Sequence, residues 1–238
     1  MCHARKMRCF VTRAVPVDHF GIAMWSSDGV WGHQVDPECE KVSEPIQVTD
    51  ATGKEASFAP AKDFGQLPDG WFEAPDIAFY RDIYTQLVPQ NGATVEVGVY
   101  RGRSIMSVAD IIRQRNIHAI CVDTFGSYLG DSSTTLYEDF GATLINAGMT
   151  EHIAPLKMPS VYAAAQVPLD SLDFAFIDGD HSYESVRDDI KAWLPRIKKG
   201  GWIGGHDYGT EDGVTQAVNE AFKEITGRPD SSIWLARR

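Results

Sequence analysis

The chain has 238 residues, of which 43% are hydrophobic, and its 33 acidic and 22 basic residues give a formal net charge of −11 at pH 7. This composition excludes wholesale disorder, and the length predicts one domain with an appendage or two small domains. The acidic balance argues against a protein that binds nucleic acid or an anionic membrane, because such proteins present a basic face. No apolar run reaches the roughly 20 residues of a membrane span or follows the basic first residues as a signal peptide would. The four cysteines form no CxxC pair, so we expect a soluble cytoplasmic protein in which Cys121 is a reduced core residue.

Residues 1–70 differ in texture from the rest of the chain. Their short apolar patches are broken by Gly, Pro, Ser and Asp, and Asp28-Gly29 suits the tight turn of a hairpin. We predict an N-terminal extension of unknown role over residues 1–70, irregular or with short β-strands, followed by one domain over residues 71–238.

From residue 71, short apolar runs alternate with helical patterns. A helix that begins at Pro75 would bury one face, formed by Ile77, Tyr80, Ile83, Tyr84 and Leu87. Strands are predicted at residues 93–99, 117–123, 152–156, 172–178, 202–206 and 233–236. Helices are predicted at residues 104–115, 136–147, 160–165, 183–194 and 213–225, the last ended by Gly227. This alternation predicts a three-layer α/β fold with a mostly parallel sheet.

In such a fold, ligands bind at the carboxyl ends of the strands. Acidic residues lie at or near four of the predicted strand ends, namely Glu96, Asp123, Asp178 and Asp207. An acidic crevice favours a cationic or metal-assisted ligand over a pyrophosphate.

The turn after the first predicted strand has glycines at Gly98 and Gly102, which allow a ligand close to the backbone. Tyr100 replaces the middle glycine of the dinucleotide fingerprint, which disfavours a pyrophosphate there. Asp123, at the end of the next strand, could accept both hydroxyls of a ribose. An ordinary strand–helix turn and a capping carboxylate are the alternatives.

Two further strand ends combine carboxylates with imidazoles. Asp178-Gly179-Asp180-His181 follows an apolar strand, and His206-Asp207 follows a glycine-rich one. Crowded carboxylates favour a bound cation or a catalytic role. The alternative is that Asp180 or His181 caps the helix that follows.

These motifs, together with the segment from Asp173 to Tyr208, resemble class I S-adenosylmethionine-dependent methyltransferases. They are most similar to methyltransferase family 24, near the macrocin-type sugar O-methyltransferases. The resemblance covers residues 71–238 and implies a Rossmann-like methyltransferase fold. It implies cofactor contacts from Glu96, Gly98, Tyr100, Gly102, Ser104, Asp123, Ser160 and Asp178.

The resemblance also implies a divalent metal, Mg²⁺ or Mn²⁺, held by Asp178, His206 and Asp207. Asp180 would be the general base, with His181 as the other candidate for the proton. The metal-dependent relatives carry two acids where this chain has His206-Asp207. Imidazole suits Mn²⁺, Fe²⁺ or Zn²⁺ better than Mg²⁺, so either the metal differs or His206 is itself a base.

The expected activity is O-methylation of a small-molecule hydroxyl on a sugar or glycosylated metabolite, without nucleic-acid or membrane partners. Sugar-modifying relatives self-associate through N-terminal elements, so the resemblance also implies a homo-oligomer. Three alternatives stay open: a catechol-type O-methyltransferase, an NAD-linked oxidoreductase or epimerase, and a non-catalytic S-adenosylmethionine-binding module.

Overall fold

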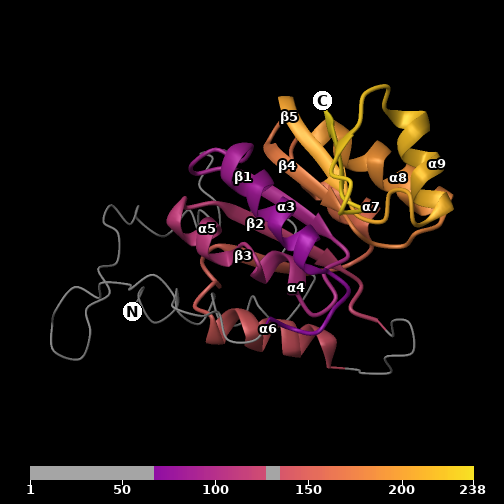
Figure 1. The fold of residues 1–238 in the computed structure, drawn as a ribbon. Helices are drawn as coiled ribbons and strands as arrows, with labels where there is room; N and C mark the ends of the chain where they lie inside the picture. The colour runs from indigo at the N-terminus through magenta and orange to yellow at the C-terminus, as the bar shows by residue number, and fades with distance from the viewer. Residues whose placement is uncertain (1–66, 127–134) are drawn as a thin grey trace, which may run out of the picture.

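The computed structural model describes residues 67–126 and 135–238 (Figure 1). Residues 1–66, with the predicted turn at Asp28-Gly29, and most of the loop after the second strand lie outside this part of the chain.

Within these ranges the chain alternates strands and helices, as predicted. The strands are β1 (Ala93–Val97), β2 (His118–Asp123), β3 (Ile153–Lys157), β4 (Leu172–Ile177), β5 (Ile197–Gly205), β6 (Thr226–Gly227) and β7 (Trp234–Arg237). The helices are α3 (Ala74–Gln86), α4 (Arg103–Met106), α5 (Ala109–Gln114), α6 (Leu136–Asn146), α7 (Ser160–Gln166), α8 (Tyr183–Trp193), α9 (Asp212–Ala221) and the 3₁₀ turn η2 (Leu194–Arg196).

The strands form one seven-stranded sheet in the order β3-β2-β1-β4-β5-β7-β6. β1 to β5 run parallel, and β7 lies antiparallel to both β5 and β6. The strand order reverses between β1 and β4, and a crevice at the carboxyl ends opens at such a switch point. The predicted Rossmann-like α/β fold is therefore confirmed.

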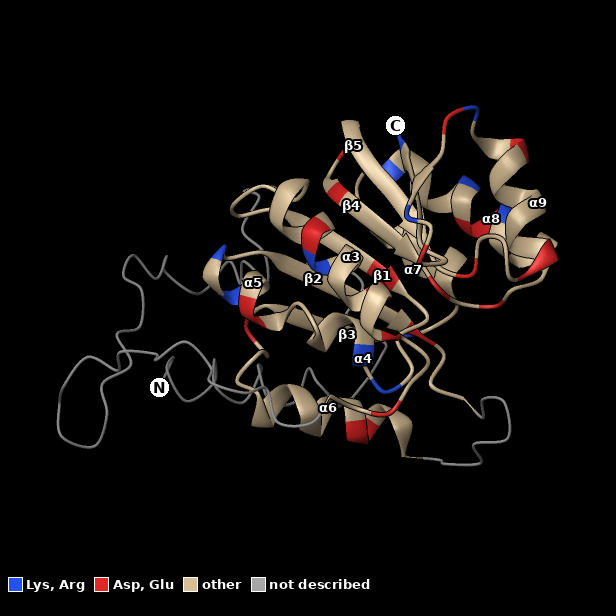
Figure 2. Ribbon diagram, viewed as in Figure 1, with Lys and Arg blue, Asp and Glu red and all other residues tan. Residues whose placement is uncertain are grey.

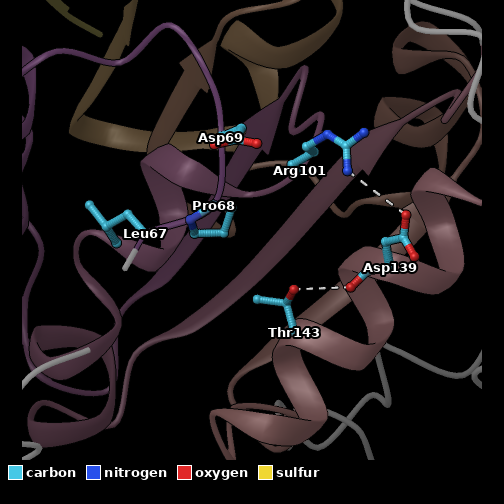
Figure 3. Close-up of a pocket in the computed structure, with 6 residues that line it drawn as sticks. All are labelled: Leu67, Pro68, Asp69, Arg101, Asp139 and Thr143. Atoms are coloured by element: carbon cyan, nitrogen blue, oxygen red, sulfur yellow. Dashed lines mark hydrogen bonds and ion pairs between the residues drawn. The ribbon is translucent and has the colours of Figure 1, made fainter. Parts of the chain in front are cut away.

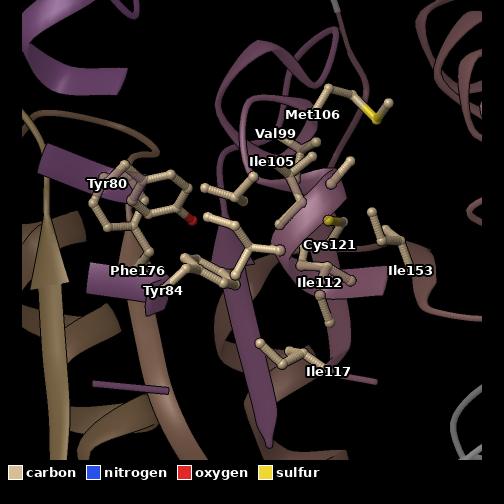
Figure 4. Packing of buried hydrophobic residues seen from close by; sticks show 14 of the residues in the cluster. Tyr80, Tyr84, Val99, Ile105, Met106, Ile112, Ile117, Cys121, Ile153 and Phe176 are labelled. Carbon is tan, nitrogen blue, oxygen red and sulfur yellow. The ribbon is translucent and has the colours of Figure 1, made fainter. Parts of the chain in front are cut away.

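Both faces of the sheet are covered by helices, which explains why the strands are apolar at successive positions. In β2, Ala119 and Cys121 pack in a core with α3, α5 and α6, whereas Ile120 and Val122 pack in a second core with α7, α8 and α9. Figure 4 shows part of the first core, in which Tyr80, Tyr84 and Phe176 lie together. Cys121 is a free, fully buried cysteine, as predicted.

The helix predicted at Pro75 forms α3. Its first turn contains the proline, and Asp76 accepts a hydrogen bond from the backbone N–H of Glu73 at 3.1 Å as part of a capping box. Tyr80, Ile83 and Tyr84 are buried on its inner face, as the spacing predicts.

Two predicted helices were wrong in extent. The helix predicted over residues 104–115 is divided into α4 and α5, because the Ser107 hydroxyl donates to the Ser104 carbonyl and its own carbonyl accepts from Arg81.

The helix predicted over residues 213–225 ends at Ala221, where Phe222 turns to an extended backbone and packs on Trp234. Gly227 therefore does not end a helix; it pairs with Trp234 in the sheet.

Acidic residues appear on α6, α8 and α9 in Figure 2, in line with the negative net charge. No helix in the described ranges is long and apolar enough to cross a bilayer.

Candidate active site

β1 ends because Gly98 turns the backbone to φ +84°. A Cβ on this residue would lie 1.8 Å from the carbonyl oxygen of Asp178, a distance that no side chain tolerates. Gly102, at φ +88°, has a similar constraint, since its Cβ would meet the Phe140 ring at 2.5 Å. Only glycine fits at Gly98, and its absent side chain brings the loop after β1 directly against the end of β4.

Asp123 ties this loop to the end of β2. One carboxylate oxygen accepts the backbone N–H of Tyr100 at 2.8 Å, and the other accepts that of Phe125 at 2.7 Å. Tyr100 has φ +50°, so a tyrosine adopts the left-handed backbone that the dinucleotide fingerprint gives to glycine. Each Asp123 oxygen keeps a further lone pair that a ribose hydroxyl can use.

Glu96 and Ser104 lie beneath the loop. Glu96 is fully buried, and its carboxyl accepts hydrogen bonds from Tyr80 Oη at 2.8 Å and from Ser104 Oγ at 2.5 Å. Burial raises the pKa of Glu96 to about 8, against the lowering effect of these two hydroxyls. In this arrangement both residues support the loop from below, and their predicted contact with a cofactor stays a prediction.

At the neighbouring strand ends, Asp178, His181 and Asp207 come together. One donor atom from each lies within 4.8 Å of the others, and His181 Nε2 lies 3.2 Å from Asp207 Oδ2. Burial raises the pKa of Asp178 to about 6. Two carboxylates and an imidazole so arranged fit a divalent cation, and the imidazole suits Mn²⁺, Fe²⁺ or Zn²⁺ better than Mg²⁺.

His206 lies on the other side of these acids. Its Nδ1 is 3.8 Å from Asp178 and 3.4 Å from Asp207, whereas its Nε2 is 3.4 Å from Asp76 of α3. The ring also packs on Phe72, at a centroid distance of 5.2 Å. Burial lowers the pKa of His206, but the three carboxylates outweigh it and raise the pKa to about 9.

A raised pKa favours the protonated ring, which offers no lone pair to a metal. The predicted role of His206 as a metal ligand stays a prediction. The sequence analysis missed Phe72 and Asp76, because only the long-range packing of this part of the chain brings them to His206.

Asp180 makes its hydrogen bonds with Ser182, which is not part of this cluster. It accepts hydrogen bonds from the backbone N–H and the hydroxyl of Ser182, the residue that precedes α8. These bonds lower the pKa of Asp180 and weaken it as a base. The alternative reading of Asp180 as a residue that orders the start of α8 agrees with this geometry.

Ser160, predicted near the adenine, is the first residue of α7. Its hydroxyl accepts the indole N–H of Trp193 at 2.8 Å. Burial raises the pKa of Asp189 to about 6, and a hydrogen bond with Ser160 partly offsets this rise. The structure thus places its side chain against α8.

Residues 95–208 match the family model described as a methyltransferase domain. Three solved structures share the fold. The O-methyltransferase NovP has 20% identity and a TM-score of 0.56, over 68% of this chain and 78% of that one. CalS11, a TDP-rhamnose 3′-O-methyltransferase of calicheamicin biosynthesis, has 17% identity and a TM-score of 0.52, over 70% and 81%. A candidate caffeoyl-CoA O-methyltransferase from Staphylococcus aureus has 12% identity and a TM-score of 0.55, over 71% and 84%. No curated protein sequence matches the chain.

The sheet order, the glycine-lined loop after β1 and the acid at the end of β2 define a Rossmann-like site for a nucleoside cofactor. With the family match, residues 95–208 form a class I S-adenosylmethionine-dependent methyltransferase domain. The matched domain is of methyltransferase family 24, as the resemblance of the motifs predicted.

Proposed function

We propose that this methyltransferase acts on a hydroxyl of a small molecule, a sugar or glycosylated metabolite, with the help of a divalent cation. The observation that carries the proposal is the convergence of Asp178, His181 and Asp207 beside the cofactor loop. The fold shared with NovP and CalS11 adds weight, because one of these proteins methylates a sugar.

Methyl transfer from a sulfonium needs an acceptor oxygen aligned behind the methyl group and a place for its proton. A sugar hydroxyl is a very weak acid, and a divalent cation would lower its pKa and fix its direction. We assign the cation to the carboxylates of Asp178 and Asp207. Although burial opposes ionisation of Asp207, contact with His206 lowers its pKa, so this carboxylate is ionised at neutral pH.

We assign the proton to His181, so in this proposal its imidazole is not a ligand of the cation. Its Nε2 lies beside the Asp207 carboxylate, which would stabilise the imidazolium as the proton arrives. Asp180 is the weaker candidate, since its oxygens are engaged by Ser182 and its pKa is lowered.

The test is formation of S-adenosylhomocysteine from S-adenosylmethionine with Mn²⁺, Mg²⁺ or EDTA. The acceptor panel contains nucleotide sugars such as TDP-rhamnose, neutral glycosides and catechols. We expect turnover of a sugar member that EDTA reduces at least tenfold. The variants Asp178→Asn and Asp207→Asn should lose a similar factor, and the control Asp188→Asn, on an exposed acid of α8, should not.

Calorimetric titration with S-adenosylhomocysteine, with NAD⁺ as the comparison, completes the test. Turnover of catechols alone would contradict the proposal that the acceptor is a sugar. Turnover that EDTA leaves intact would contradict the proposal that a divalent cation assists the reaction. Self-association and a cytoplasmic location stay predictions.

A further inference from the structure

Trp71, three residues before the start of α3, presents an exposed indole at the edge of the site. It is 58% exposed, and its ring lies 5.1 Å from that of Tyr100. A large apolar ring left accessible beside a site is a common element of ligand pockets.

The neighbours of Trp71 connect it to both halves of the site. Phe72, the next residue, packs on His206 beside the acids, and Tyr100 donates its backbone N–H to Asp123 on the cofactor side. The indole itself contacts the cofactor loop through Tyr100, and the residue that follows it contacts the acidic cluster.

A charged side chain, that of Arg101, lies next to the Tyr100 ring. The Arg101 guanidinium lies 5.3 Å from the centroid of the Tyr100 ring, and Arg101 Nε donates to Tyr100 Oη at 3.1 Å. Arg101 also lines a cavity of about 360 Å³, where it faces Asp139 of α6 (Figure 3). The other residues that line this cavity are Leu67, Pro68, Asp69 and Thr143.

The charges of this cavity indicate what kind of group it accepts. One guanidinium stands against the carboxylates of Asp69 and Asp139, so a phosphate would meet as much repulsion as attraction. A neutral polyol suits it better, because hydroxyls donate to carboxylates and accept from a guanidinium.

We propose that the Trp71 indole, supported from behind by the Tyr100 ring, forms a platform on which the C–H face of a neutral sugar ring of the acceptor stacks, with its hydroxyls directed towards Arg101, Asp69 and Asp139. This inference rests on the proposed function and makes Trp71 a specificity-determining residue for the acceptor. Binding of the cofactor is not expected to depend on the platform.

The test is saturation-transfer NMR of methyl α-L-rhamnopyranoside and methyl β-D-glucopyranoside with the protein loaded with S-adenosylhomocysteine. We expect signals for at least one glycoside that Trp71→Ala abolishes, Trp71→Phe partly retains and the control Tyr162→Ala, on an exposed aromatic of α7, leaves unchanged. Calorimetry should give the same affinity for S-adenosylhomocysteine, within twofold, in all four proteins. With an active sugar acceptor, Trp71→Ala should raise KM at least tenfold and change kcat much less.

Two outcomes would overturn the platform. One is the absence of a glycoside signal with the wild-type protein, and the other is that Trp71→Ala weakens S-adenosylhomocysteine binding as much as it weakens the glycoside signal. A glycoside signal that depends on Trp71 without any sugar methylation would support the platform and contradict the proposed function. Methylation of catechols with no glycoside signal would support methyltransferase activity and contradict the proposed platform for a sugar.

Discussion

The carbonyl oxygen of Asp178 lies where a side chain on Gly98 would begin, since a Cβ there would approach it to 1.8 Å. The contact joins the ends of β1 and β4, which are adjacent in the sheet although 80 residues separate them. It places a residue of the cofactor loop directly against a residue of the acidic cluster. The two halves of the active site thus share a backbone contact that only glycine allows.

Gly98→Ala should consequently destabilise the protein by about 3 kcal/mol or more, because the clash is with backbone and φ is positive. Urea unfolding measures the change. The matched control is Gly141→Ala in α6, where a Cβ meets nothing within 4 Å and the helix should gain about 0.5–1 kcal/mol. Equal stabilities for the two variants would show that the ends of β1 and β4 do not touch as described.

Asp180→Asn should retain turnover within a few-fold, whereas His181→Gln should lower kcat by about 10²-fold or more, the usual contribution of a general base. The reason is that Asp180 is engaged by Ser182, while His181 lies beside Asp207. The measurement is kcat with the active acceptor, and calorimetry with Mn²⁺ separates proton transfer from metal binding. The reverse ranking of the two variants would restore Asp180 as the base.

Glu96 should make stability fall as pH rises. Unfolded, this carboxyl ionises near 4.5, and burial raises its folded pKa to about 8, so the folded state holds a proton that the unfolded state has released across this window. The stabilisation is complete below pH 4.5 and decreases by up to about 1.4 kcal/mol per pH unit until pH 8.

Glu96→Gln removes this titration and should lose less stability than the wild type between pH 6 and pH 8 in urea unfolding. Glu138→Gln, on an exposed acid of α6, should keep the wild-type slope. Parallel curves for Glu96→Gln and the wild type would mean that Glu96 is ionised in the folded protein.

A second pH effect comes from the opposite end of the sheet. The rings of His118 and His152 stack at a centroid distance of 5.9 Å, and burial lowers the pKa of both below 6.5. Below pH 6.5 the unfolded state binds more protons than the folded state, so these residues favour folding fully above that pH and less as it falls.

The double variant His118→Gln/His152→Gln should therefore have a flatter dependence of the unfolding free energy on pH between 5 and 7, measured in urea. An unchanged slope would show that neither pKa is lowered in the folded protein. Activity at pH 7 should be retained, because both residues lie at the amino ends of β2 and β3, away from the site.

The sequence by itself determined the alternation of strands and helices, the glycine-rich turn after β1 and the acids at the strand ends. These are local properties: periodicity, backbone freedom and residue type can be read over a few positions. The same local reading misplaced the end of α9, because the contact of Phe222 with Trp234 and the pairing of Gly227 in the sheet are long-range.

Only the tertiary structure decided which polar groups meet. The sequence made His181 a candidate for the proton and His206 a metal ligand or a base. The packing of α3 gave His206 the partners Asp76 and Phe72 and left His181 next to Asp207. Likewise, Glu96 has the sequence position of a cofactor ligand, yet Tyr80 and Ser104 enclose it. Burial and long-range contacts set the protonation and orientation of these side chains, and neither is encoded in the spacing of residues along the chain.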